Sequence, residues 1–284
     1  MTSLFLSIMF FIVPPNMVPH DFAVMSEGKQ IITVTRDYYT LPFLSDPFID
    51  EDKIQFLLDK LEQKIYQKPI DARLDDAGEI VSEKPGRTLD RDKLNLQFRK
   101  YFYYGQPQKV NVPTKAIYPR VDSELLASIR VNEIGNYVTY FKQSNKERSH
   151  NIDLASEAIN NYVVFPGETF SFNKVVGKRT KEKGYKRAPV IVKGELAEDI
   201  GGGICQVSST LYNAVDLAGL EVVERYSHSR KVPYVPPGRD ATVSWFGPDF
   251  AFKNKYHQPV LIRAKSMNGR MYVKIYSSED ISGE

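Results

Sequence analysis

Residues 201–219 have the sequence GGGICQVSSTLYNAVDLAG and carry the strongest fold signal in the chain. An apolar stripe at about 100° per residue, which Leu217 falls outside, predicts an amphipathic helix; it consists of Ile204, Val207, Leu211, Ala214, Val215 and Ala218. Gly219 is suited to end that helix, because glycine often follows the last helical residue. The three glycines before Ile204 allow unusual backbone angles and the close approach of another molecule. The pattern therefore predicts a central helix that begins after a glycine turn.

Cys205 has a distinctive position in this helix. It lies roughly 130° from the centre of the apolar stripe and shares its face with Ser209 and Tyr212. It is the only cysteine among 284 residues, so the chain cannot form an intrachain disulfide. In the first turn of a helix, the dipole and the unpaired N–H groups favour the thiolate, which is the reactive form of cysteine. The same N–H groups are suited to stabilise an oxyanion.

Two polar residues follow the helix in an order that suits nucleophilic catalysis. Residues 221–229 are expected to form a strand that carries His228. Residues 240–246 alternate in polarity and are expected to form a strand that begins with Asp240. In a Cys-His-Asp site the imidazole takes the thiol proton, and the carboxylate orients the imidazole. The sequence therefore predicts Cys205, His228 and Asp240 as candidate catalytic residues.

Other assignments of the same residues stay open. Asp249 competes with Asp240 for the role of the acid, and His257 competes with His228 for the role of the base. Free cysteine also fills space in many protein cores without any reaction. Zinc on Cys205, a histidine and an aspartate would lack the close ligand spacing of known zinc motifs. We therefore expect no metal site and no cofactor.

The first 130 residues predict a separate small α+β domain. Ile31–Thr35 alternates like a strand, and Asp50 is expected to cap a helix that runs to about Lys68. A second helix is expected over 88–101 and a further strand over 109–112. This region holds no acid–base pair, metal-ligand cluster or phosphate loop. On its own residues it is predicted to be a binding or spacer domain.

The rest of the chain adds a loop, a helix and a hairpin. Residues 130–155 are polar and predict a connecting loop, followed by a helix over 152–162. Residues 178–187 hold six basic residues and one acid, which indicates a solvated loop or a surface for anionic polymer or lipid headgroups. Residues 258–266 and 270–277 are apolar-rich and are joined through Asn-Gly, which predicts a β-hairpin.

The composition and the amino-terminal segment limit the classes of protein to which the chain can belong. Lys and Arg total 38 against 35 for Asp and Glu, and this net charge of +3 argues against a dedicated nucleic-acid-binding protein. Leu4–Val13 is apolar and has the length of the hydrophobic part of an export signal, although no basic residue precedes it. It is too short to span a bilayer, which needs about 20 residues. A buried strand or helix turn is the alternative interpretation of this segment.

A series of short motifs occurs in order between residues 150 and 265. These motifs are Pro166–Asn173, Gly177–Thr180, Gly184-Tyr185, Gly201–Asn213, Glu224-Arg225 with His228-Ser229, Tyr234-Val-Pro, Gly238–Thr242 and Lys253-Asn254. Together they resemble the VanW family. Upstream, residues 68–72 and 85–89 resemble the peptidoglycan-binding domain often found before VanW domains. Family members are exported or membrane-anchored proteins of the bacterial envelope. The resemblance therefore implies association with the cell wall, but it does not supply a reaction.

From these observations we expect an α+β protein of two domains. The first is a small α+β domain, and the second is a VanW-like domain with a central helix packed on antiparallel strands. The expected division is a signal or anchor segment at 1–26, a peptidoglycan-binding domain at 27–130 and the VanW-like domain at 131–284. The resemblance implies a place outside the cytoplasm, at the cell surface or anchored to the membrane through the amino-terminal segment, with peptidoglycan or its stem peptides as partner.

Three functions are compatible with the sequence. The leading hypothesis is thiol-dependent acyl transfer or hydrolysis on wall peptides, by Cys205, His228 and Asp240. The second is a non-catalytic module in which the glycine turn and an arginine hold the carboxylate of a stem peptide. The third is a scaffold for wall enzymes. The candidate binding residues are Gly201, Gly202, Gly203, Gln206, Ser208, Tyr212, Arg225 and Arg239, with Arg230 as a further cation.

Overall fold

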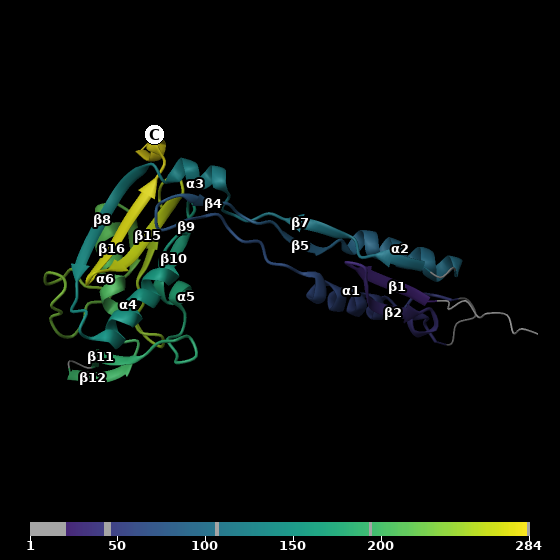
Figure 1. The fold of residues 1–284 in the computed structure, drawn as a ribbon, viewed down its shortest axis with the longest axis horizontal. Helices are drawn as coiled ribbons and strands as arrows, with labels where there is room; N and C mark the ends of the chain where they lie inside the picture. The colour runs from purple at the N-terminus through teal and green to yellow at the C-terminus, as the bar shows by residue number, and fades with distance from the viewer. Residues whose placement is uncertain (1–20, 43–46, 106–107, 193–194, 283–284) are drawn as a thin grey trace, which may run out of the picture. The chain divides into compact units, whose positions relative to one another are not determined.

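The computed structural model describes residues 21–42, 47–105, 108–192 and 195–282 (Figure 1). The chain forms two compact units. The first comprises residues up to Ile70 together with Lys84–Pro119, and the second comprises Asp71–Glu83 together with Arg120–Glu284. The fold is mixed α+β in both units, as the sequence predicts. Leu4–Val13, the expected export segment, lies outside the described residues.

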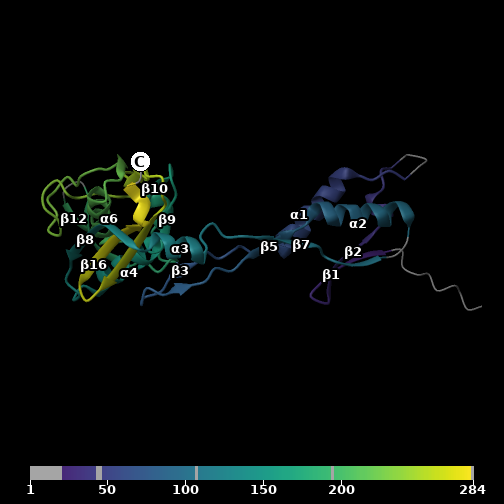
Figure 2. The same ribbon diagram turned by 90° about the horizontal axis from the view of Figure 1, so that it is seen from above.

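The first unit packs two helices on a small sheet (Figure 2). Helix α1 (Glu51–Ile65) begins after Asp50, whose carboxylate accepts the Lys53 N–H at 3.2 Å. Helix α2 (Arg91–Tyr104) is the second predicted helix, displaced by three residues. The strands are β1 (Asp21–Ser26), β2 (Lys29–Thr35) and β6 (Gln108–Asn111) in the order β2-β1-β6, and a separate ladder pairs β5 (Gly86–Leu89) with β7 (Thr114–Ile117). A short 3-10 helix, η1 (Asp37–Tyr39), follows β2.

The second unit is built on an antiparallel sheet of four strands in the order β8-β16-β15-β9. Strand β15 (Val260–Met267) and strand β16 (Arg270–Ser277) form the predicted hairpin. Asn268 and Gly269 turn it with φ of +54° and +73°, which Asn-Gly adopts readily. Strand β8 (Asn132–Tyr140) and strand β9 (Tyr162–Val164) complete the sheet.

The prediction of a connecting loop at 130–155 is wrong. Residues 132–140 form β8, and α4 (Lys146–Ile159) begins six residues earlier than predicted, after its cap Asn145. The polar sequence of β8 reflects a strand that is only partly covered, because buried positions are few and exposed polar ones separate them. The polar sequence therefore led to the prediction of a loop where the structure has a strand.

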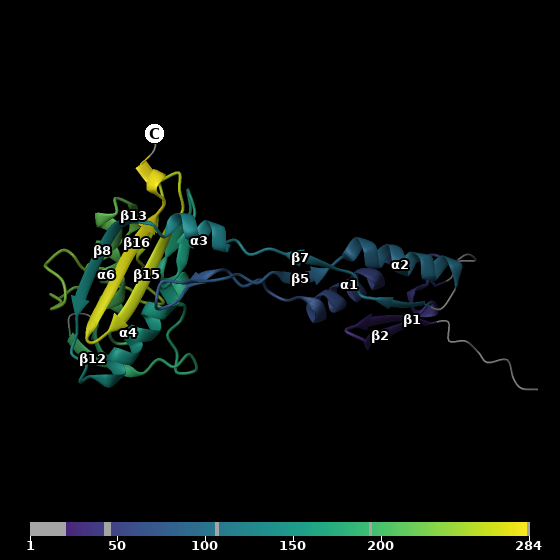
Figure 3. The ribbon, with the colours of Figure 1, turned by 45° about the horizontal axis from the view of Figure 1, so that its top comes forward.

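Two helices cover one face of this sheet (Figures 1 and 3). Helix α6 (Ile204–Leu217) packs on β8 and β16, and α4 packs on β15. The apolar stripe predicted for α6 is buried against the sheet. This is the expected central helix on antiparallel strands, and the glycine turn stands at its amino-terminal end.

Smaller elements surround this core. A second sheet has the order β10-β14-β13, formed by β10 (Thr169–Ser171), β14 (Ala251–Lys253) and β13 (Glu221–Glu224). The remaining elements are the hairpin of β11 (Arg187–Val192) and β12 (Glu195–Ile200), the helices α3 (Ser123–Ile129) and α5 (Phe172–Val176), the short strands β3 (Arg73–Leu74) and β4 (Ile80–Val81), and η2 (Glu279–Ser282). In the described part of the chain, no helix has the length and apolar character needed to cross a membrane.

The two strands expected to carry His228 and Asp240 are shorter or absent. Strand β13 ends at Glu224, and residues 225–250 form a long loop without a helix or strand. The backbone of this loop bonds to side chains of α6 instead of a neighbouring strand. Ser208 Oγ donates to the Ala241 carbonyl at 2.6 Å, and Ser209 Oγ accepts the Ala241 N–H at 2.9 Å. Side chains thus satisfy polar groups that a sheet ladder would otherwise pair.

Candidate functional site

The glycine turn that precedes α6 is packed tightly against its own chain. Gly201 and Gly203 have φ of +89° and +107°, a region that other residues rarely adopt. A Cβ on Gly202 would lie 2.5 Å from the Ala188 carbonyl oxygen, and one on Gly203 would lie 2.9 Å from Arg148 Cγ. The three glycines are therefore required for folding of the turn, whatever they bind.

Cys205 is held in a half-buried position at the start of α6. Its Sγ lies 3.6 Å from the Val243 carbonyl oxygen and 3.9 Å from Thr242 Oγ1. The His228 side chain lies close enough to the thiol to lower its pKa. The long loop thus brings the predicted base to the predicted nucleophile across 23 positions of sequence.

Asp240 binds His228 through both ring and backbone. His228 Nδ1 lies 2.6 Å from Asp240 Oδ2, and the His228 N–H donates to the same oxygen at 2.6 Å. Both side chains are nearly buried, with exposed fractions of 6% and 10%. Arg225 fixes the same segment, since its Nη1 donates to the Asp240 carbonyl at 2.8 Å. The three residues predicted from the sequence therefore lie together as an acid, a base and a thiol.

The electrostatics of the three groups favour an ion pair. Burial raises the pKa of Cys205, but the hydrogen bond and positive charge of His228 outweigh it, so that the thiol pKa lies below its ordinary value. Burial lowers the pKa of His228, but Cys205 and Asp240 outweigh it, so that the imidazole pKa lies above its ordinary value. The Asp240 pKa is lowered by its hydrogen bonds to His228 despite burial. These directions correspond to a thiolate and an imidazolium held by a carboxylate.

Three further side chains face this group and were not identified as site residues from the sequence. Arg148 and Arg179 both interact electrostatically with Cys205. Tyr234 also interacts electrostatically with Cys205, and burial raises the pKa of Tyr234 far above the ordinary range. Arg179 and Tyr234 occur in motifs that resemble the VanW family, and this resemblance is the sequence signal that could have identified them as site residues. Arg148 occurs in the segment that the sequence predicted as a loop.

The predicted binding side chains are engaged within the protein. Gln206 is 1% exposed, and its amide donates to Thr139 Oγ1 at 2.9 Å and accepts from Arg148 at 2.7 Å. Ser208 is buried and bonds to the loop backbone. Two guanidinium groups lie near the Tyr212 ring, that of Arg225 at 4.6 Å and that of Arg239 at 4.9 Å from its centroid.

Arg225 and Arg239 have further internal partners. Arg225 Nη1 donates to the Gly238 carbonyl at 3.0 Å. Arg239 Nε donates to Asn213 at 2.6 Å, and its Nη1 pairs with Asp216 at 2.8 Å. Both arginines therefore tie the loop to α6. Arg230 is exposed, and no role is evident for it in the structure.

The rival acid and base occupy other surroundings. Asp249 accepts hydrogen bonds from the Ser171 hydroxyl and from the Asn173 N–H, the latter at 2.9 Å, so it holds the first turn of α5 and its cap Ser171. His257 is exposed. Among the described residues, no group of three or more His, Cys, Asp and Glu side chains has an arrangement that would hold a metal ion.

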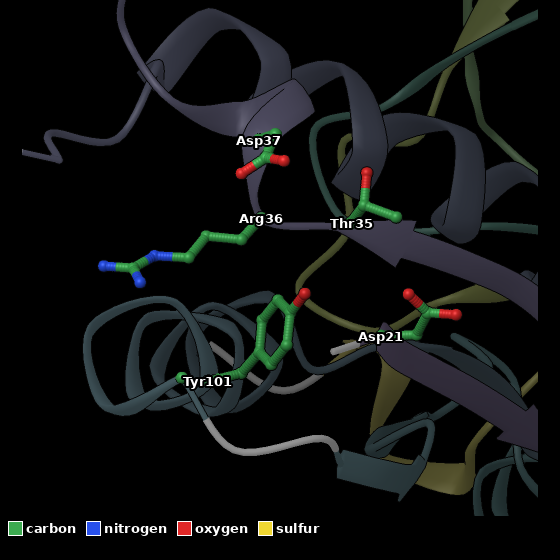
Figure 4. Close-up of a pocket in the computed structure, with 6 residues that line it drawn as sticks. Asp21, Thr35, Arg36, Asp37 and Tyr101 are labelled. Carbon is green, nitrogen blue, oxygen red and sulfur yellow. The ribbon is translucent and has the colours of Figure 1, made fainter. Parts of the chain in front are cut away.

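The first unit has a cavity of its own, of about 340 Å³ (Figure 4). The Tyr101 hydroxyl donates to the Val34 carbonyl at 3.4 Å. The Arg36 guanidinium lies 5.2 Å from the Phe102 ring centroid. The lining residues are Asp21, Thr35, Arg36, Asp37, Tyr101 and Gly105.

Comparison with known proteins identifies the relatives of this chain. Residues 147–276 match the family model described as "VanW like protein". YoaR of Bacillus subtilis (strain 168), an uncharacterized protein, is 55% identical over 274 residues, which cover 96% of this chain and 90% of YoaR. The chain belongs to the VanW family.

Two further matches agree with this membership. Residues 18–111 match the family described as "Putative peptidoglycan binding domain". The vancomycin B-type resistance protein VanW of Enterococcus faecalis (strain ATCC 700802 / V583) is 34% identical over 99 residues, or 33% of this chain and 36% of that protein. No solved structure matches the chain. The VanW-family member described here is accordingly a cell-wall-associated protein.

Proposed function

We propose that this VanW-family protein is a cysteine acyl transferase or hydrolase that acts on wall peptides. The observation that carries the proposal is the Cys205–His228–Asp240 arrangement at the amino-terminal end of α6. Its pKa directions favour the thiolate, which is the form that attacks a carbonyl. The match to a peptidoglycan-binding family supports peptidoglycan as the source of the substrate.

In the proposed reaction, the Cys205 thiolate attacks the carbonyl carbon of a peptide bond in a stem peptide. Ile204 and Gln206 already donate their N–H groups within the turn, at 3.3 and 3.0 Å, so we assign the Cys205 N–H to the developing oxyanion. His228 then donates its proton to the leaving amine as the C–N bond breaks and a thioester forms. Asp240 keeps the imidazole oriented in both half-reactions.

The second half-reaction releases the acyl group from sulfur. Water or the amine of another wall peptide loses a proton to His228 and attacks the thioester carbonyl. The C–S bond breaks, and the thiolate returns. Water as the acceptor gives a carboxylate, and an amine gives a new peptide bond. The proposal covers both acceptors, because they share the same acyl-enzyme.

The acyl-enzyme provides the direct test. The full chain would be mixed with soluble muropeptides, quenched in acid and analysed by intact mass. An adduct on Cys205 is expected, and it should disappear in Cys205→Ala and fall by at least ~100-fold in His228→Ala. His257→Ala is the matched control, because it removes an exposed imidazole outside the site and should leave the adduct unchanged. Product release with wild-type rate by Cys205→Ala would refute the proposal.

The location of the protein is part of the same proposal. A substrate in the wall requires that the second unit act outside the cytoplasm. Leu4–Val13 is the segment we assign to export or anchoring, and the peptidoglycan-binding region at 27–130 would retain the protein at its substrate. Fractionation of cells that express the full chain would test this assignment. Recovery in the cytoplasmic fraction alone would contradict it.

A further inference from the structure

A turn beside the candidate site exposes two large aromatic side chains. Trp245 is 42% exposed and Phe246 is 87% exposed, and their ring centroids are 6.5 Å apart. The turn begins just after Val243, whose carbonyl contacts the Cys205 thiol. A single exposed apolar residue needs no explanation, but adjacent aromatics at the tip of one turn indicate an interaction surface.

Hydrogen bonds hold this turn in one conformation. The Ser244 N–H donates to the Pro248 carbonyl at 2.8 Å, and the Gly247 N–H donates to the Ser244 carbonyl at 3.3 Å. The Asn173 amide donates to the same two carbonyls, at 2.9 and 3.2 Å. The aromatic rings are therefore presented on an ordered loop, so that little conformational entropy is lost when a partner covers them.

The neighbouring loop is strongly basic. Lys178 Nζ lies 5.3 Å from the centroid of the Phe246 ring. The Lys183 ammonium lies beside Gly177, where an added Cβ would meet it at 2.5 Å. One acid, Glu182, stands among the cations of this loop, which are Lys178, Arg179, Lys181, Lys183, Lys186 and Arg187. A cationic surface thus adjoins the exposed aromatic turn.

We propose that Trp245, Phe246 and the 178–187 loop form a surface that binds an anionic lipid bilayer. The bilayer interface supplies an apolar phase for the rings and negative headgroups for the lysines. A soluble anionic polymer would pair with the lysines but would leave Phe246 in water. The Lys178 ammonium lies near the Phe246 ring, and a lysine stem can extend beside an inserted ring to the headgroups.

This surface goes beyond the proposed reaction and does not require it. Its residues are not those of the Cys205–His228–Asp240 group, and of the 178–187 loop only Arg179 is described here as facing the thiol. Because the aromatic turn adjoins the thiol, bilayer binding would bring the site close to the headgroups. Wall peptides carried on membrane lipids would then be within reach of Cys205.

The chain contains its own probe for this proposal. Trp245 is the only tryptophan, so its fluorescence reports on the turn alone. The full chain would be titrated with vesicles of phosphatidylcholine and phosphatidylglycerol at 7:3, and with vesicles of phosphatidylcholine alone. Anionic vesicles should shift the emission to shorter wavelength, and brominated lipid should quench it. The neutral vesicles should produce a much smaller change.

Matched variants separate the two parts of the surface. Phe246→Ser should weaken vesicle binding about fivefold through lost apolar burial. Lys178→Glu with Lys183→Glu should weaken it by at least ~10-fold. Tyr140→Ser is the control for the aromatic change, because Tyr140 is 67% exposed on β8 outside this surface, and its vesicle response should equal that of the wild type.

Two results would overturn the proposal. Sedimentation with anionic vesicles but unchanged Trp245 emission would show that other residues attach the chain. An equal emission shift with soluble polyphosphate would assign the surface to anionic polymer instead. Cys205→Ala distinguishes this proposal from the enzymatic one, because it should remove the covalent adduct and keep the vesicle response.

Discussion

Asp240 Oδ2 accepts both the ring Nδ1–H and the backbone N–H of His228, each at 2.6 Å. One carboxylate oxygen therefore fixes the position and the orientation of the imidazole. With Nδ1 committed to Asp240, the other ring nitrogen is left for the Cys205 thiol. This double attachment explains how a loop without strand pairing can hold the base in position.

Asp240→Asn should alter the reactivity of the thiol. The neutral amide no longer raises the His228 pKa, so that Cys205 loses much of its imidazolium partner and its own pKa rises. We expect alkylation by iodoacetamide to slow by about tenfold at pH 6 and to be unchanged near pH 10. Cys205 is the only thiol, so the rate reports on it alone. His257→Ala is the control, and coincident pH profiles for wild type and Asp240→Asn would contradict the expectation.

The same pair should make stability depend on pH. Because the Asp240 pKa is lowered in the folded protein, its contribution is present above the ordinary carboxyl pKa and is lost as pH falls through the lowered value. The His228 pKa is raised, so its contribution is lost as pH rises through the raised value. The stability advantage of wild type over Asp240→Asn should be about 1.5–3 kcal/mol near pH 6, and smaller at pH 3 and at pH 10. Urea unfolding at the three pH values measures it, and a difference that grows toward acid would contradict the assignment.

Gly135→Ala should destabilise the second unit. Gly135 lies on β8 where α6 crosses, and a Cβ there would lie 2.4 Å from the Ala214 carbonyl oxygen. Backbone atoms on both sides must separate, so we expect a loss of at least ~2 kcal/mol in urea unfolding. Gly247→Ala is the matched control, since its nearest neighbour is the movable Ser244 hydroxyl at 3.1 Å. Equal losses for the two variants would show that the helix does not press on the strand.

Local patterns in the sequence predict the elements whose stability is local. Helix α6, its glycine turn and the Asn-Gly hairpin follow from periodicity and turn chemistry, and all three occur as expected. Asp50 caps α1 for the same reason. Strand β8 does not follow from its polar sequence, because its pairing with β16 is set by residues more than 100 positions away.

The candidate site likewise has one part that local sequence patterns predict and one part that depends on long-range contacts. Cys205 at the start of a helix could be predicted, because helix position alone makes it distinctive. The structure places His228 and Asp240 beside the thiol, but in the loop that follows β13 and not on strands. Their loop is held by Ser208, Ser209 and other α6 side chains, and such long-range bonds leave no periodic trace in sequence.

Arg179→Met should raise the pKa of Cys205. Arg179 is a half-buried cation in electrostatic contact with the thiol, and its Nη1 donates to Asn173 at 2.7 Å. Water screens a charge poorly at a site of low solvent exposure, so removing the guanidinium should raise the thiol pKa and lower the fraction of thiolate. Alkylation at pH 6 should therefore slow about threefold to tenfold. Lys178→Met removes the adjacent but exposed charge, which water screens, and should have a smaller effect. Arg179→Lys should recover most of the rate. Equal slowing by Arg179→Met and Lys178→Met would mean that the net charge of the loop, and not Arg179 itself, acts on the thiol.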